Sequence, residues 1–252
     1  MEDRNEKIEG DVSIKTPFMT KLENFWYHYK WHTIAVIFII VVIAVASTQM
    51  ITKTSYDVHI LYAGNHKIEK VSSDGNSTTP FTNTLKSFNR MIGDLDGDGE
   101  VNVNLLDLFI MTPEEIAEFN KNSDGTTQLN EIQIKENTDA LEGSYLLFGD
   151  YYIFFISPTL FEKYNERYDG ALFAPIKNYA DEELLSSLEL TENGCGVMLR
   201  SLAAHSLAGI EKLPDDTVVC IRNKSSFANS RENESHRRSE EAMREILSYT
   251  VK

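Results

Sequence analysis

Asp94, Asp96 and Asp98 form the part of the chain whose residue types and spacing best match a known kind of binding site. Gly99 is the sixth residue of the loop, which reads DLDGDGEVN from Asp94 to Asn102. Calcium prefers six to eight oxygen ligands, and alternate residues of a tight turn can direct their oxygens toward one centre. The sequence therefore predicts a structural calcium ion (Ca2+) bound by Asp94, Asp96, Asp98, the backbone carbonyl of Glu100, and Asn102.

The loop departs from an EF-hand in its second half. An EF-hand has a bidentate acid at the twelfth position, where this chain has Leu105. Residues 101–111 begin in strict apolar–polar alternation, which predicts a strand where an EF-hand has its exit helix. An acidic β-turn without a metal ion is the alternative, because Asp-Gly pairs favour turns with or without a metal.

Recognisable catalytic motifs are absent from the sequence. No G-x-S-x-G, H-E-x-x-H, C-x-x-C or G-x-x-x-x-G-K pattern occurs. Cys195 and His205 would act as a nucleophile and its base only if the fold brought them together, and Cys195 and Cys220 would form a disulfide only under the same condition. The sequence favours a binding or accessory domain over an enzyme. A cell-surface hydrolase with unrecognised catalytic acids and a structural component of an envelope complex are the alternatives.

The elements that position this loop follow a predicted transmembrane signal-anchor helix at residues 31–51. Thirteen consecutive apolar residues run from Ile34 to Ala46, and the whole segment has no acidic or basic side chain apart from His32. Twenty-one helical residues extend over roughly 32 Å, enough for a bilayer core of about 30 Å. A soluble core helix and a signal peptide cleaved after Ala46 are the alternatives.

The distribution of cations predicts the orientation of this anchor. Lys21 and Lys30 lie just before the span, whereas Lys53 is the only close cation after it. Because positively charged flanks stay inside, we expect a cytoplasmic tail at residues 1–30 and an extracytoplasmic domain at residues 52–252 in the cell membrane. The lipid bilayer is then the partner of residues 31–51.

The predicted outer domain is acidic. The chain has 24 Lys+Arg and 39 Asp+Glu, a net charge of −15. The tail contributes 5 basic and 6 acidic residues, so 19 − 33 = −14 belongs to the domain. Nucleic-acid binding needs a basic surface and is excluded as a function on this ground. A solvated acidic surface and cation binding both agree with the charge.

Alternating elements predict an α/β fold with a mixed sheet. Helices are expected to begin at Pro80, Pro113 and Pro158, each preceded by a Ser or Thr cap. Two further helices are expected at 181–188 and 239–249, and a helical segment at 137–148. The predicted strands are 56–63, 101–111, 129–134, 151–156, 197–202 and 217–222.

The chain resembles uncharacterised single-pass membrane-anchored proteins of anaerobic Firmicutes that contain an EF-hand- or dockerin-like DxDxDG loop. The matching segments are Trp31–Ile51, Tyr56–Gly64 and Asp94–Asn102. A weaker similarity to extracellular solute-binding proteins lies in Gly149–Phe155 and Gly170–Ile176. These resemblances imply an outer domain that binds a solute or protein partner of unknown identity, and they assign no ligand residues.

Overall fold

The computed structural model describes residues 17–51, 55–70, 79–122, 129–225 and 229–250. These residues form two compact units, divided between Thr54 and Ser55. The first contains one long helix, and the second contains a sheet with helices on both faces. Residues 1–16 of the predicted tail and residues 52–54 of the predicted domain lie outside the described part.

Helix α1 (Pro17–Ile51) makes up the described part of the first unit. Pro17 suits a first helical position, because its missing N–H group would have no partner there. Residues Phe25–Thr48 are long and apolar enough to cross a membrane by length and composition. The predicted apolar helix at 31–51 is therefore present. It begins at Pro17, so the second half of the expected tail is helical as well.

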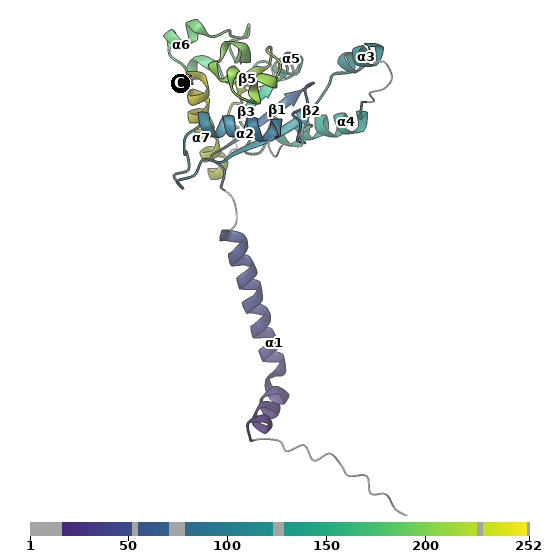
Figure 1. The fold of residues 1–252 in the computed structure, drawn as a ribbon, viewed down its shortest axis with the longest axis vertical. Coiled ribbons are helices and arrows are strands. Elements are labelled where there is room, and N and C mark those ends of the chain that lie inside the picture. The colour runs from purple at the N-terminus through teal and green to yellow at the C-terminus, as the bar shows by residue number, and fades with distance from the viewer. Residues whose placement is uncertain (1–16, 52–54, 71–78, 123–128, 226–228, 251–252) are drawn as a thin grey trace, which may run out of the picture. The chain divides into compact units, whose positions relative to one another are not determined.

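A five-stranded mixed sheet is the centre of the second unit, in the order β2-β1-β3-β5-β4 (Figure 1). β1 pairs in parallel with both β2 and β3, whereas β5 is antiparallel to β3 and β4. This confirms the predicted mixed sheet of an α/β fold. The strands are β1 (Val58–Gly64), β2 (Val103–Phe109), β3 (Ile153–Ile156), β4 (Gly196–Met198) and β5 (Val218–Ile221).

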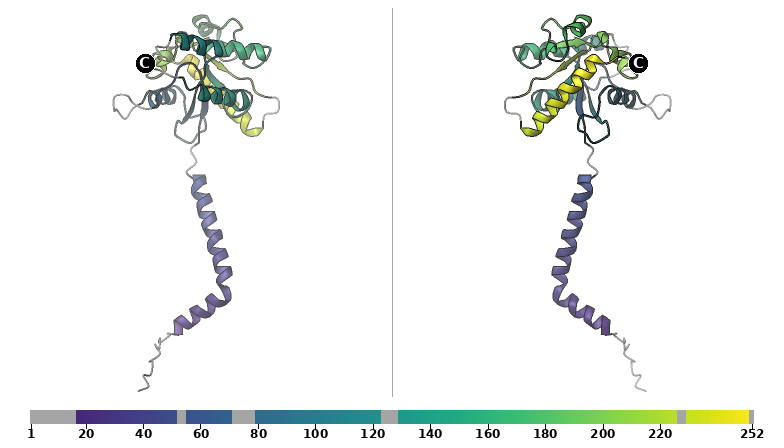
Figure 2. Two further views of the ribbon diagram at one scale, coloured as in Figure 1. Left: turned by 90° about the vertical axis from the view of Figure 1, so that its right-hand side faces the viewer. Right: turned by 90° about the vertical axis from the view of Figure 1, so that its left-hand side faces the viewer.

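Helices cover both faces of this sheet. α2 (Pro80–Met91) and α7 (Ser230–Ser248) contribute Phe88 and Met243 to one apolar core. α5 (Pro158–Arg167) contributes Leu160 and Tyr164 to the second core, on the opposite face. Figure 2 shows α7, in yellow, running across one face. The remaining helices are α3 (Pro113–Asn122), α4 (Glu131–Ala140), the π-helical turn Leu141–Tyr145, α6 (Glu182–Ser187), and the 3₁₀ turns Ile176–Asn178, Leu199–Ser201, Ala203–Ser206 and Ile210–Lys212.

Local capping explains why several helices begin where they were expected. The Thr79 hydroxyl accepts a hydrogen bond from the Thr82 N–H group, directly before Pro80. The Thr112 hydroxyl accepts from the Glu115 N–H group, and α3 starts at Pro113. Because these contacts reach only three residues along the chain, the sequence alone specifies them.

Several expected boundaries are wrong. Residues 129–134 are not a strand, because Asn130 caps α4 by accepting from the Gln133 N–H group. The helix expected at 137–148 is the end of α4 and a π-helical turn that stops at Tyr145. β4 ends at Met198, where a 3₁₀ turn replaces the rest of the expected strand. α7 starts at Ser230, well before residue 239, because Asn229 and Glu232 form a capping box.

Candidate metal centre

Asp57 lies directly before β1 and connects the acidic loop to the sheet. Its side-chain oxygen Oδ1 accepts hydrogen bonds from the backbone N–H groups of Leu95 (2.6 Å) and Asp96 (3.1 Å). Oδ2 accepts from the N–H group of Asn102 at 2.7 Å. The Asp57 residue is only 3% exposed. One buried carboxylate therefore holds both the start and the end of the loop.

Asp94 organises the turn from within. One of its oxygens accepts from the Gly97 N–H group at 2.6 Å, and the other accepts from the Gly99 N–H group at 2.9 Å. Gly97 and Gly99 have φ angles of 77° and 89°, a conformation that side chains with a Cβ rarely adopt. The two glycines thus allow the loop to curl around the Asp94 carboxylate.

Asp96 contacts a cation and a hydroxyl group. The Ser55 hydroxyl donates to its carboxylate, and Nη1 of Arg238, on α7, lies 3.7 Å from Oδ2. The Ser55 hydrogen bond is the largest cause that holds the pKa of Asp96 below its ordinary value, and the Arg238 charge acts in the same direction. Only 6% of the Asp96 side chain is exposed. Asp96 is thus a charged carboxylate in a largely closed position.

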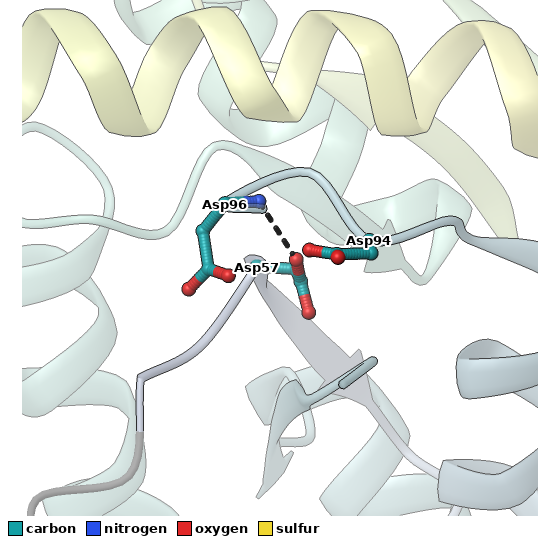
Figure 3. Close-up of side chains that lie close together, drawn as sticks. All are labelled: Asp57, Asp94 and Asp96. Atoms are coloured by element: carbon teal, nitrogen blue, oxygen red, sulfur yellow. Dashed lines mark hydrogen bonds between the residues drawn. The ribbon is translucent and has the colours of Figure 1, made fainter. Parts of the chain in front are cut away.

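The structure brings together two of the predicted ligands and one acid that was not predicted. Oxygens of Asp57, Asp94 and Asp96 all lie within 4.8 Å of one another (Figure 3). The side chains of Asp98 and Glu100 are exposed and lie outside this cluster of carboxylates, and the Asp98 carboxylate accepts from the Glu100 N–H group at 2.9 Å. Asn102 reaches the cluster through its backbone N–H group, which donates to Asp57.

Sequence reasoning missed Asp57 because it belongs to the start of a strand and not to the loop. An acid directly before a run of apolar strand residues is a weak signal, since most such acids are exposed. Its partners Leu95 and Asn102 are separated from it by 38 and 45 positions. Only the parallel pairing of β1 with β2, which places Val58 opposite Val103, brings them together.

Burial disfavours a nucleophilic role for either cysteine. Cys195 and Cys220 are both buried and unpaired. Burial raises the pKa of both thiols, which disfavours the reactive thiolate. Nε2 of His205 lies 3.1 Å from the Asp215 carboxylate. The structure thus gives the two cysteines a role in packing.

Asp107, in β2, is a carboxyl group with an altered pKa outside the cluster. Burial raises its pKa to about 6, and the charges of Lys70 and Lys67 oppose that shift. Its Oδ1 atom is buried without a hydrogen-bond partner among the described residues. Perturbed carboxyl groups occur both at functional sites and in structural cores. The raised pKa of Asp107 alone therefore does not identify a catalytic site.

Comparisons with protein-family models, with curated proteins and with solved structures find no match to this chain.

Proposed function

We propose that this chain is a single-pass membrane protein whose acidic α/β domain lies outside the cell and binds a solute or protein partner. In this proposal a structural calcium ion stabilises the loop between α2 and β2. The observation that carries the calcium proposal is the convergence of Asp57, Asp94 and Asp96. Helix α1 supports the membrane part, because its length and apolar composition suit a bilayer span.

The cluster retains free acceptor positions for a cation. A carboxylate has about four lone-pair positions. Asp57 accepts three hydrogen bonds from the loop, and Asp94 accepts two. Each can therefore offer a further position to an ion without releasing the loop. Hard oxygen ligands of this kind suit calcium, and neighbouring loop oxygens and water would complete its coordination.

The proposed role of the ion is structural. Three carboxylates with oxygens within 4.8 Å of one another repel, and Arg238 offsets this repulsion at Asp96, from which it lies 3.7 Å. A divalent cation at their centre would remove this repulsion and fix the loop to the start of β1. No described His or Cys belongs to the cluster, and Asp57 is enclosed by loop backbone. The site therefore suits an ion that stabilises a binding domain.

Calcium is expected to raise the melting temperature of the domain. The buried residues of the described chain all lie between Asp57 and Leu247, so a fragment from Ser55 contains the core. With a dissociation constant near 20 μM, about 2 mM calcium would add about 2.7 kcal/mol to the free energy of unfolding. This corresponds to a rise of about 5–10 °C for a domain of this size, measured by circular dichroism against a sample in EDTA.

The control for this experiment is Asp96→Ala. The variant should unfold at the same temperature in calcium and in EDTA, because it lacks one of the three clustered carboxylates. If the unmodified fragment shows no calcium-dependent rise, the loop is an acidic turn and the calcium proposal is wrong. Magnesium at the same concentration should produce a smaller rise, because it requires a stricter octahedral geometry.

Single cysteines test the proposed orientation. The native Cys195 and Cys220 are buried, so an introduced exposed cysteine should dominate the labelling of the folded protein. Phe148→Cys, at a residue 62% exposed in the domain, should react in intact cells with a maleimide that cannot cross membranes. Leu22→Cys, at a residue 53% exposed before the apolar span, should react only after the membrane is permeabilised.

Two results would contradict this arrangement. Labelling of Leu22→Cys in intact cells would place the N-terminal side outside. Loss of the Leu22 label from the mature protein, with Phe148→Cys still labelled, would indicate that α1 is cleaved as a signal peptide.

A further inference from the structure

A pocket with a volume of about 780 Å3 lies between α3, α4 and the first turns of α5. Ile110 and Thr112 follow the carboxyl end of β2, and Thr159 and Leu160 follow the carboxyl end of β3. In open α/β sheets, ligands bind outside the carboxyl ends of the strands. The pocket is also within the size range of small-molecule sites, about 300–1,000 Å3. Its position and its volume thus both suit a small ligand.

Apolar side chains dominate the lining of this pocket. They come from three separate elements and include Ile116 of α3, Ile132 and Ile134 of α4, and Leu160 of α5. Ile132 is 74% exposed, and in the described part of the domain only one other large apolar side chain, Phe148, is more than half exposed. α3 buries none of its residues. An apolar ligand would cover side chains that the domain itself leaves in water.

The two lysines of the lining are paired within the protein, whereas its acids Glu114 and Glu131 are exposed to water. Nζ of Lys135 lies 2.7 Å from Asp139, also on α4. Nζ of Lys163 lies 2.9 Å from Glu142, which also accepts hydrogen bonds from Tyr164 and Arg167. Neither lysine is therefore a free cation for a ligand anion. The pairing favours an uncharged ligand over a carboxylate or a phosphate.

We propose that this pocket binds an uncharged apolar small molecule that arrives from water. The inference rests on the proposed function of a binding domain and names the class of its ligand. The volume limits the ligand to a small molecule, since a peptide helix with side chains is about 10–12 Å across. Hydrophobic burial against the isoleucines supplies the affinity, and Thr112, Thr138 and Thr159 supply hydroxyl groups at the lining.

Photolabelling of the full-length protein in lipid nanodiscs tests this assignment. The probe is adamantane diazirine added from water, and the labelled peptides are identified by mass spectrometry. Peptides spanning 110–116, 131–138 and 159–163 are expected to carry most of the label found in the outer domain. Ile132→Glu should lower this labelling by about tenfold. An apolar ligand would remove water from the new carboxylate and offer it no hydrogen bond in return. The fold should survive, since Ile132 is mostly exposed.

Phe148→Glu is the matched control. It replaces the other highly exposed apolar side chain of the described domain and lies outside the pocket lining, so labelling should match the unmodified protein. Circular dichroism verifies that both variants are folded. Equal labelling of the pocket peptides in Ile132→Glu and Phe148→Glu would overturn the proposal. So would labelling only by a phospholipid with a diazirine in its acyl chain, because the ligand would then be a lipid of the bilayer.

The calcium response of the same samples separates this inference from the proposed function. Pocket labelling without any calcium-dependent stabilisation would support the pocket assignment and contradict the calcium proposal. Calcium-dependent stabilisation with no preference of the probe for the pocket peptides would overturn the pocket assignment alone.

Discussion

Replacing Asp57 by alanine is expected to lower the free energy of unfolding of the domain by about 3 kcal/mol, even without calcium. Three backbone N–H groups, of Leu95, Asp96 and Asn102, would lose their acceptor. Each loss costs about 1 kcal/mol where water can replace part of the lost bond. Urea unfolding of the fragment from Ser55, in EDTA, measures this change.

The same variant is expected to lose the stabilisation by calcium. Asp57 is part of the cluster, and it also holds the backbone from which Asp94 and Asp96 extend. Asp98→Ala is the matched control, because Asp98 is exposed and its carboxylate accepts from within the loop, at Glu100. That control should change the free energy of unfolding by about 0.5 kcal/mol or less. Equal effects of the two substitutions would contradict the central position of Asp57.

The difference between these two acids shows how far the sequence could predict the site. The spacing of Asp94, Asp96 and Gly99 is local, and the structure has the turn that this spacing predicts. Asp98 fits the same spacing, yet its side chain lies outside the cluster. Asp57, directly before β1, joins Asp94 and Asp96 instead, through a contact that depends on the register of β1 with β2. Sequence spacing specifies a loop, whereas sheet pairing determines which carboxylates converge.

The fold likewise divides into local features that the sequence predicts and long-range features that it does not. The starts of α2 and α3 were predictable, because Thr79 and Thr112 cap these helices through hydrogen bonds that span only three residues of the chain. The segment 129–134 was predicted wrongly, because Ile132 and Ile134 alternate with polar residues as in a strand, whereas Asn130 caps a helix there. The order of the strands was not predictable from local patterns. It depends on how the connections between β1, β2 and β3 cross the sheet: Phe88 of α2 packs in one core, and Leu141, after α4, packs in the core on the opposite face.

Arg222, which follows β5, is a buried charged residue that the sequence patterns did not predict. Its guanidinium group donates to the carbonyl oxygens of Leu147 (2.7 Å), Gly149 (2.9 Å) and Tyr151 (3.3 Å). It also lies 4.2 Å from the centre of the Tyr152 ring. The residue is only 3% exposed, and burial lowers its pKa. The cation therefore holds the loop that enters β3 by its backbone.

Arg222→Met is expected to lower the free energy of unfolding by about 3–5 kcal/mol, because three carbonyl groups lose the buried charged group that donates to them. Arg222→Lys should recover only a minor part of this loss, since an ammonium group lacks the planar fork that reaches several acceptors. Urea unfolding, again on the fragment from Ser55, measures both variants. The matched control is Arg231→Met, whose side chain is 75% exposed and pairs with Asp150. An exposed ion pair contributes about 1 kcal/mol or less.

The position of Arg222 makes this result informative about binding as well as stability. The loop from Leu147 to Tyr151 connects the π-helical turn after α4 to β3, and α4 and the residues after β3 both line the proposed pocket. Loosening this loop should therefore weaken the pocket labelling in Arg222→Lys under conditions where that variant is still folded. Arg231→Met should leave the labelling unchanged. If Arg222→Lys is as stable as the unmodified domain, one donor is sufficient at this position, and the loop is held mainly by the packing of Tyr152 and its neighbours.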